Sequence, residues 1–288
     1  MGGIIYTGDV MSYKMVVLDL DGTLLDDEKK ISKNNSRILY ELNKRNIKIA
    51  IATGRNYYMA KQLTEEIKNV NPVILANNGA IIRYSHNDEL VECNYLSPAE
   101  FKKIYEEGLK YNLNPVLHVD EYANGYDLIY EREDYEAAYS GYLNRNYNRA
   151  RMMKFHPENI NNILSACYFG EYDRLCEFAG VMEELKKGSF NIICNRNISR
   201  RALLEFLNPL GCKWNALKKY SAQVKVLPEE IISIGDDNND IELLKNSGFG
   251  IAMKNGTEES IRAAKTVSVY DNNNSGVYYA LSEIFKIV

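Results

Sequence analysis

Two aspartates, Asp19 and Asp21, come directly after the apolar run MVVL in the stretch DLDGTLLDD. Residues two apart in a strand point to the same side, so both carboxylates face one spot if the chain stays extended to Asp21. Two ionised carboxylates that close are unfavourable unless a cation lies near them. The pair therefore indicates a cation site at a strand end, and Gly22 lets the backbone turn sharply after it.

A second acidic group could supply further ligands for this cation. The stretch IGDDNND follows another apolar run and contains Asp236, Asp237 and Asp240. All these candidate ligands are oxygens, and no His or Cys pair stands at the spacing of a transition-metal site. Hard oxygen ligands that leave room for water and a phosphate suit Mg²⁺.

Other residues have the chemistry of an anion site. Thr53 and Gly54 stand in ATGR, where a strand turns into a helix, so a hydroxyl and backbone N–H groups can bind phosphate oxygens. Lys213 opens another helix, and its ammonium can neutralise phosphate charge. Carboxylates, a divalent cation, a hydroxyl and an ammonium around one spot indicate phosphoryl transfer through a covalent aspartyl-phosphate.

The elements that must position these residues alternate between strand and helix. Between residues 15 and 82, apolar runs at 15–20, 47–54 and 72–80 alternate with helical patterns at 32–46 and 55–69. The alternation returns after residue 200, beginning with the expected strand RALLEFL. This pattern predicts an α/β fold with a doubly wound, Rossmann-like parallel sheet. Such sheets bind ligands beyond the carboxyl ends of their strands.

About a hundred residues between the two blocks have a different character, too long for a structureless loop. They contain a helix start at Ser97, Pro98 and Glu100 and a hairpin around Asn124-Gly125, followed by strand, helix and strand patterns. We expect an inserted α+β cap domain. The predicted domains are a core of residues 1–84 and 189–288 and a cap of residues 85–188.

Composition narrows the class of protein further. With 288 residues and a net charge of -4, the chain has no general attraction to nucleic acid or to an anionic membrane. No apolar run approaches the roughly 18 residues of a spanning helix. Five scattered cysteines without a CxxC pair predict reduced thiols and a cytoplasmic protein. We expect no nucleic-acid or membrane partner and a monomer or weak homodimer, and assign no function to residues 1–10.

Four motifs in order, DLDGTLL, ATGR, GCKWNAL and IGDDNND, resemble those of the haloacid dehalogenase-like hydrolases. The insertion after NNGA resembles the type IIB cap of the Cof-type sugar-phosphatase branch. The resemblance covers nearly the whole chain from Met11. It implies a Mg²⁺-dependent phosphatase that acts on a small phosphorylated metabolite.

The resemblance also implies a role for each matching residue. Asp19 would be the nucleophile and a Mg²⁺ ligand, and Asp21 the general acid and then base, binding Mg²⁺ through its backbone carbonyl. Asp236 would complete the metal ligands, and Asp240 would support the site through Lys213 or a metal-bound water. The residues expected to bind phosphate are Leu20, through its backbone N–H, Thr53, Gly54, Lys213 and Asn239.

One motif departs from the family pattern. The residue after the motif lysine is commonly Gly, but here it is Trp214, and Cys212 replaces the usual polar capping residue. Cysteine is a weak helix cap, which affects how firmly Lys213 is placed.

Within the family, the substrate is open. We expect a sugar phosphate. The alternatives are a flavin-precursor, pyridoxal or nucleotide phosphate, or a phosphotransferase that resembles the phosphomannomutases. The non-enzyme alternative is a regulatory binding module that kept the fold, which predicts decay of one of the four motifs.

Overall fold

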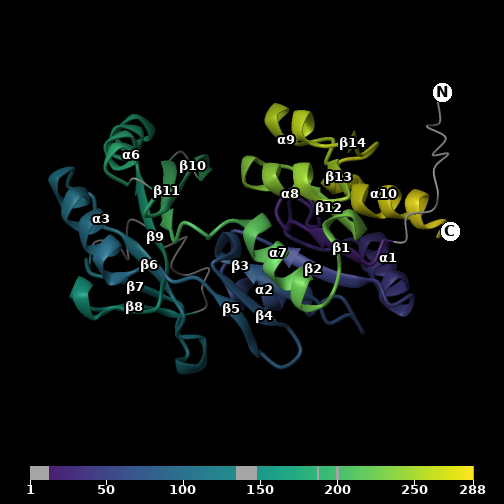
Figure 1. Ribbon diagram of the computed structural model, residues 1–288, viewed down its shortest axis with the longest axis horizontal. Helices are drawn as coiled ribbons and strands as arrows, with labels where there is room; N and C mark the ends of the chain where they lie inside the picture. The colour runs from purple at the N-terminus through teal and green to yellow at the C-terminus, as the bar shows by residue number, and fades with distance from the viewer. Residues whose placement is uncertain (1–12, 134–147, 187, 199–200, 288) are drawn as a thin grey trace. The chain divides into compact units, whose positions relative to one another are not determined.

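The computed structural model describes residues 13–133, 148–186, 188–198 and 201–287 (Figure 1). The chain falls into two compact units. The first comprises the chain up to Ile51, Ile67–Pro72 and the chain from Lys218 onward, and the second comprises Ala52–Glu66 and Val73–Leu217. None of the helices in the described ranges combines the length and apolarity that a membrane span requires.

The first unit is built on parallel strands in the order β14-β13-β12-β1-β2. In chain order, these are β1 (Met15–Leu18), β2 (Lys48–Ala52), β12 (Ile231–Gly235), β13 (Phe249–Ala252) and β14 (Thr266–Val267). All four residues of β1 are buried, as expected of a strand covered on both faces. The predicted α/β class with a parallel sheet is confirmed.

Helices connect these strands. They are α1 (Lys33–Lys44), α8 (Ile241–Asn246) and α9 (Glu258–Ala263), while α10 (Gly276–Phe285) follows β14. In α1, the Ser32 hydroxyl accepts from the Asn35 N–H at 3.1 Å, while Ile38, Leu39 and Leu42 are buried on one face. The capped start and the apolar spacing explain why this segment is a helix.

The second unit contains two groups of strands. β3 (Val73–Ala76), β4 (Ile81–Tyr84) and β5 (Leu90–Cys93) are antiparallel neighbours. A six-stranded sheet has the order β10-β11-β9-β6-β7-β8. Its strands are β6 (Val116–Val119), β7 (Leu128–Tyr130), β8 (Ala150–Met152), β9 (Ile163–Gly170), β10 (Asn191–Ile198) and β11 (Arg201–Leu207). The helices of this unit are α2 (Tyr57–Thr64), α3 (Pro98–Lys110) and α6 (Tyr172–Lys186), and α7 (Lys213–Gln223) begins in it.

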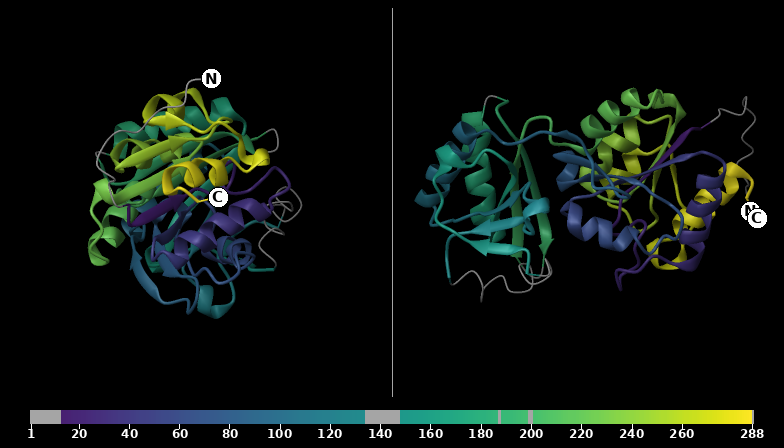
Figure 2. Two further views of the ribbon diagram at one scale, coloured as in Figure 1. Left: turned by 90° about the vertical axis from the view of Figure 1, so that its right-hand side faces the viewer. Right: turned by 90° about the horizontal axis from the view of Figure 1, so that it is seen from below.

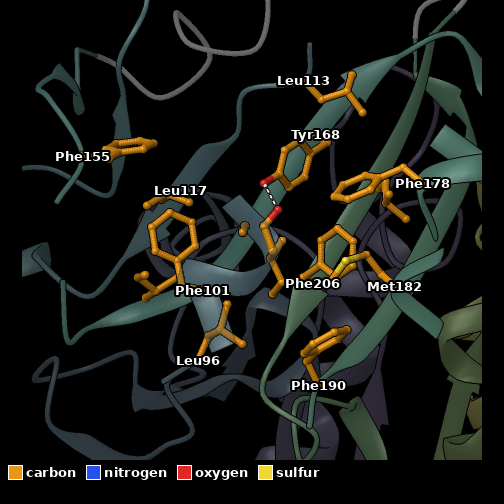
Figure 3. Packing of buried hydrophobic residues seen from close by; sticks show 14 of the residues in the cluster. Leu96, Phe101, Leu113, Leu117, Phe155, Tyr168, Phe178, Met182, Phe190 and Phe206 are labelled. Atoms are coloured by element: carbon orange, nitrogen blue, oxygen red, sulfur yellow. Dashed lines mark hydrogen bonds between the residues drawn. The ribbon is translucent and has the colours of Figure 1, made fainter. Parts of the chain in front are cut away.

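The apolar core of the six-stranded sheet lies under α3 and α6, which cover the same face (Figure 2). The ring of Tyr168 packs edge-to-face against Phe178 at 5.1 Å and Phe206 at 5.7 Å between centroids. Its hydroxyl donates to the Ile104 carbonyl at 3.3 Å (Figure 3). The predicted hairpin is confirmed, because β6 and β7 pair antiparallel around Gly125.

One strand lies in a different sheet from the one expected. RALLEFL was predicted for the parallel core, but as β11 it pairs antiparallel with β9 and β10. Leu204 and Phe206 face the core under the helices, while Leu203 joins an apolar cluster on the opposite face. Burial on both faces gives the continuous apolar run that is typical of parallel strands. The sequence pattern therefore could not distinguish a strand of the parallel sheet from this antiparallel strand of the six-stranded sheet. The division into a core of residues 1–84 and 189–288 and a cap of residues 85–188 stays a prediction.

Candidate active site

Three carboxylates meet at the carboxyl ends of two neighbouring strands of the first unit. Asp19 follows β1, Asp236 follows β12, and Asp240 ends the short helical turn η5 (Asn238–Asp240). One oxygen from each residue lies within 4.8 Å of the others. The Asp19 N–H donates to the Ile234 carbonyl at 3.0 Å, which continues the pairing of the two strands to their ends. We call Asp19, Asp236 and Asp240 the acidic cluster.

Asp240 holds the turn that follows β12. Its Oδ2 accepts from the N–H groups of Asp236 at 3.2 Å and Asp237 at 3.3 Å. The carboxylate fills the space beside Gly235, where a Cβ would lie 2.5 Å from Asp240 Cγ. Asp237 caps η5 by accepting from the Asn238 N–H at 2.7 Å. These bonds fix the Asp236 backbone.

The Asp236 side chain is held by the DGT part of the first motif. The Thr23 hydroxyl, which is fully buried, donates to Asp236 Oδ1 at 2.7 Å. Gly22 has φ +75°, and a Cβ there would lie 2.8 Å from Asp236 Cγ. Glycine is therefore required both by the backbone conformation and by the close approach of the carboxylate. This supporting role of Thr23 was not predicted from the sequence, although its place in DGT was a signal.

Asp21 lies outside the acidic cluster's set of side-chain oxygens. Its Oδ1 accepts from Lys29 Nζ at 2.8 Å, and its side chain is 40% exposed. Leu20 is buried, and Asn239 is half-buried in η5. The predicted roles of Asp21, Leu20 and Asn239 stay predictions.

In the second unit, Thr53 and Gly54 follow β2 directly, as predicted. Thr53 is buried, and its Oγ1 accepts from the Arg55 N–H at 3.1 Å. The hydroxyl keeps its own proton to donate, which is the chemistry that a phosphate oxygen requires. Asn56 then caps α2 by accepting from the Met59 N–H at 2.9 Å.

Lys213 is the first residue of α7 and only 1% exposed. A lysine this buried is uncommon and requires compensation of its charge. Cys212 acts as the helix cap, since its Sγ accepts from the Asn215 N–H at 3.3 Å. A sulfur thus replaces the usual oxygen at this cap. That Thr53, Gly54 and Lys213 join the acidic cluster in one site stays a prediction.

Buried polar side chains at the turn after β3, near Thr53, were not predicted from the sequence. Asn78 Nδ2 donates to Glu205 Oε2 at 3.3 Å, and Asn77 Nδ2 lies 2.9 Å from His118 Nδ1. Burial raises the pKa of Glu205 to about 7 and lowers the pKa of His118 to about 4. Nothing in the sequence pattern distinguishes these buried side chains from exposed ones.

Known proteins resemble this chain over most of its length. The profile of the haloacid dehalogenase-like hydrolases matches residues 16–281. The putative phosphatase YxeH of Bacillus subtilis is 23% identical over 274 residues, which cover 94% of this chain and 98% of that protein. A 5-amino-6-(5-phospho-D-ribitylamino)uracil phosphatase of the same organism, YcsE, is 27% identical over 84% of each chain.

Solved structures agree with these relatives. The crystal structure of a haloacid dehalogenase-like hydrolase from Bacteroides thetaiotaomicron has a TM-score of 0.80 and 25% identity, and the match covers 95% of this chain and 100% of that chain. The resemblance carried by the four motifs is therefore confirmed. The chain belongs to the haloacid dehalogenase-like hydrolases.

Proposed function

We propose that this phosphoric monoester hydrolase is a Mg²⁺-dependent phosphatase of small phosphorylated metabolites, foremost a sugar phosphate, and that it works through an aspartyl-phosphate on Asp19. The observation that carries the proposal is the acidic cluster, whose oxygens lie within 4.8 Å of one another at two strand ends. Family membership supports the reaction class. Despite the departure at Cys212 and Trp214, the four motifs keep the residues expected to carry the chemistry, which argues against a binding module that has lost the reaction.

The donor set of the acidic cluster fits Mg²⁺, because every candidate ligand is a carboxylate or carbonyl oxygen. Asp19 and Asp236 would hold the ion through side chains and Asp21 through its carbonyl. Asp240 would act behind them, since its Oδ2 already accepts two backbone N–H groups. When bound, Mg²⁺ supplies positive charge that stabilises the transferring phosphoryl group.

The chain's own residues carry the proton and phosphoryl transfers. An Asp19 oxygen attacks phosphorus in line, and the bond from phosphorus to the ester oxygen breaks as the new bond forms. Asp21 gives its proton to the leaving alcohol and then takes one from the water that cleaves the aspartyl-phosphate. General acid–base assistance of this kind contributes roughly 10²- to 10⁴-fold.

Phosphate binding would come from polar groups that the four motifs supply. The Leu20 and Gly54 N–H groups, the Thr53 hydroxyl, the Lys213 ammonium and the Asn239 side chain are the proposed donors. Lys213 would also absorb charge as the transition state develops. The predicted cap, residues 85–188, would cover the leaving group.

A flavin-precursor phosphatase is the second candidate, because relatives such as YcsE carry the name of that activity. Phosphate release over a panel of sugar, flavin-precursor, pyridoxal and nucleotide phosphates distinguishes the candidates. A mutase would yield an isomeric hexose phosphate in place of free phosphate.

The expected setting is the cytoplasm. The expected partner is a small phosphorylated metabolite, with no nucleic acid or membrane partner, and the protein is expected to be a monomer or weak homodimer. None of the five cysteines forms a disulfide within the described residues, which supports a reducing compartment.

Asp19→Asn tests the reaction, with Asp173→Asn in the exposed first turn of α6 as the matched control. We expect Asp19→Asn to abolish phosphate release and the control to keep it. Wild-type turnover by Asp19→Asn would refute the mechanism.

A further inference from the structure

The loop at residues 53–55 is held by the turn that follows β3. The Asn78 N–H donates to the Thr53 carbonyl, and the Asn77 N–H donates to the Arg55 carbonyl, both at 2.9 Å. Asn77 and Asn78 have φ of 49° and 54°, a left-handed conformation that asparagine tolerates better than most residues. The shape of the loop therefore depends on this turn.

The Asn78 side chain connects the loop to the six-stranded sheet. Its Oδ1 lies 3.3 Å from the position that a Cβ would take at Gly54, so the amide packs directly on the Gly54 backbone. Its Nδ2 donates to Glu205 Oε2 at 3.3 Å. Asn78 is 1% exposed, so this amide is enclosed between Gly54 and Glu205.

Glu205 lies on the face of the six-stranded sheet opposite α3 and α6. Its neighbours Leu204 and Phe206 face the helices, and side chains alternate along a strand, so Glu205 points the other way. There it pairs across the sheet with Cys167, whose thiol lies 3.6 Å from Glu205 Oε1, in a face that also contains Leu203. A carboxyl in such surroundings is costly to bury and must be hydrogen-bonded.

We propose that Glu205 is a positioning residue for phosphate binding, which acts by orienting the Asn78 amide against the loop at residues 53–55. This inference rests on the proposed role of Thr53 and Gly54 as phosphate donors. Without the acceptor at Glu205, the Asn78 amide loses a hydrogen bond that helps to orient it, and its packing against the Gly54 backbone changes. The phosphate donors then lose their alignment.

A separate bond keeps the turn folded when Glu205 is changed. Asn77 and His118 of β6 hydrogen-bond at 2.9 Å, and the two backbone bonds to the loop do not involve Glu205. The effect of substituting Glu205 is therefore expected at the loop and not as general unfolding.

The test compares Glu205→Leu, which removes the acceptor at similar volume, with Glu205→Gln, which keeps an oxygen for Asn78 Nδ2. We expect Glu205→Leu to raise both KM and the inhibition constant of inorganic phosphate about tenfold or more, the consequence of one lost buried hydrogen bond. Glu205→Gln should rescue both constants, and the Mg²⁺ concentration for half-activation should stay unchanged in both variants. Equal effects of the two substitutions, or an unchanged phosphate constant in Glu205→Leu, would overturn the proposal.

Asn78→Gly adds a double-variant cycle. If Glu205 acts through Asn78, Glu205→Leu should have no further effect on phosphate inhibition in the Asn78→Gly background. If the two substitutions multiply each other's effect on the inhibition constant of phosphate, Glu205 does not act through Asn78.

Hydrogen exchange of the Gly54 and Arg55 amides in the substrate-free protein separates this inference from the proposed reaction. We expect faster exchange in Glu205→Leu than in Glu205→Gln, whatever the outcome for Asp19→Asn. Identical exchange in the two variants would show that Glu205 does not position the loop.

Discussion

Replacing Gly22 with alanine should separate the geometry of the acidic cluster from the stability of the fold. Gly22 has φ +75°, and an added Cβ would lie 2.8 Å from Asp236 Cγ and 3.0 Å from its Oδ1. That Oδ1 accepts the Thr23 hydroxyl at 2.7 Å. The carboxylate must therefore rotate away, which breaks the bond to Thr23 and moves one oxygen of the cluster.

The size of the effect follows from two contributions. The left-handed backbone costs an alanine about 1–2 kcal/mol of folding stability. Losing a hydrogen bond to a charged group costs about 1.5–3 kcal/mol. If the second contribution appears in metal binding, the Mg²⁺ concentration for half-activation should rise roughly ten- to a hundredfold, since 1.4 kcal/mol is tenfold in an equilibrium constant.

Gly125→Ala is the matched control, because Gly125 has φ +80° and no neighbouring atom within 4 Å of an added Cβ. Both variants should lose a similar amount of stability from backbone strain in chemical unfolding. Only Gly22→Ala should need more Mg²⁺ for phosphate release. If Gly22→Ala responds to Mg²⁺ as the control does, the account of Asp236 is wrong.

Three further predictions concern the cluster, the metal and pH. Thr23→Val should raise the Mg²⁺ requirement about tenfold by removing the bond to Asp236, and Thr23→Ser should restore it; equal behaviour of the two in a Mg²⁺ titration would contradict this. A chelator should abolish phosphate release, and Mg²⁺ should restore it better than Ca²⁺, which takes more ligands at longer distances than Mg²⁺. Activity that survives chelation would exclude the proposed cofactor. The raised pKa of Glu205, about 7, contributes folding stability that is fully present below about pH 4.5 and is lost as pH rises towards 7. The lowered pKa of His118, about 4, contributes folding stability that is fully present above about pH 6.5 and is lost as pH falls towards 4. Each contribution to the free energy of unfolding is up to about 3 kcal/mol. Glu205→Gln should therefore be more harmful near pH 5 than near pH 7 and His118→Gln the reverse, measured by chemical unfolding; the same pH trend for both would refute the assignment.

Much of the fold could be predicted because its strands and helix starts follow local rules. The apolar runs before Asp19 and Asp236 are buried parallel strands, and Ser32 and Ser97 cap the helices that were expected after them. RALLEFL was placed in the wrong sheet, because an apolar run records burial on both faces but not the identity of the neighbouring strand.

The acidic cluster could be predicted from the sequence as far as the order of the strands could be predicted. Asp19, Asp236 and Asp240 come together because β1 and β12 are neighbours. The contribution of Glu205 was not predictable, since its distance from Asn78 depends on how β11 packs against the turn after β3, and a single polar residue in an apolar strand gives no sign of its partner.

Direct detection of the covalent intermediate tests whether Asp19 is the nucleophile. Wild-type protein mixed with substrate and Mg²⁺, quenched in acid within one turnover and digested, should yield a peptide that carries a phosphoryl group on Asp19, and Asp173→Asn should yield the same peptide. Asp19→Asn should give no phosphopeptide and no phosphate. A phosphoryl group on another residue, or full turnover with none on Asp19, would contradict it.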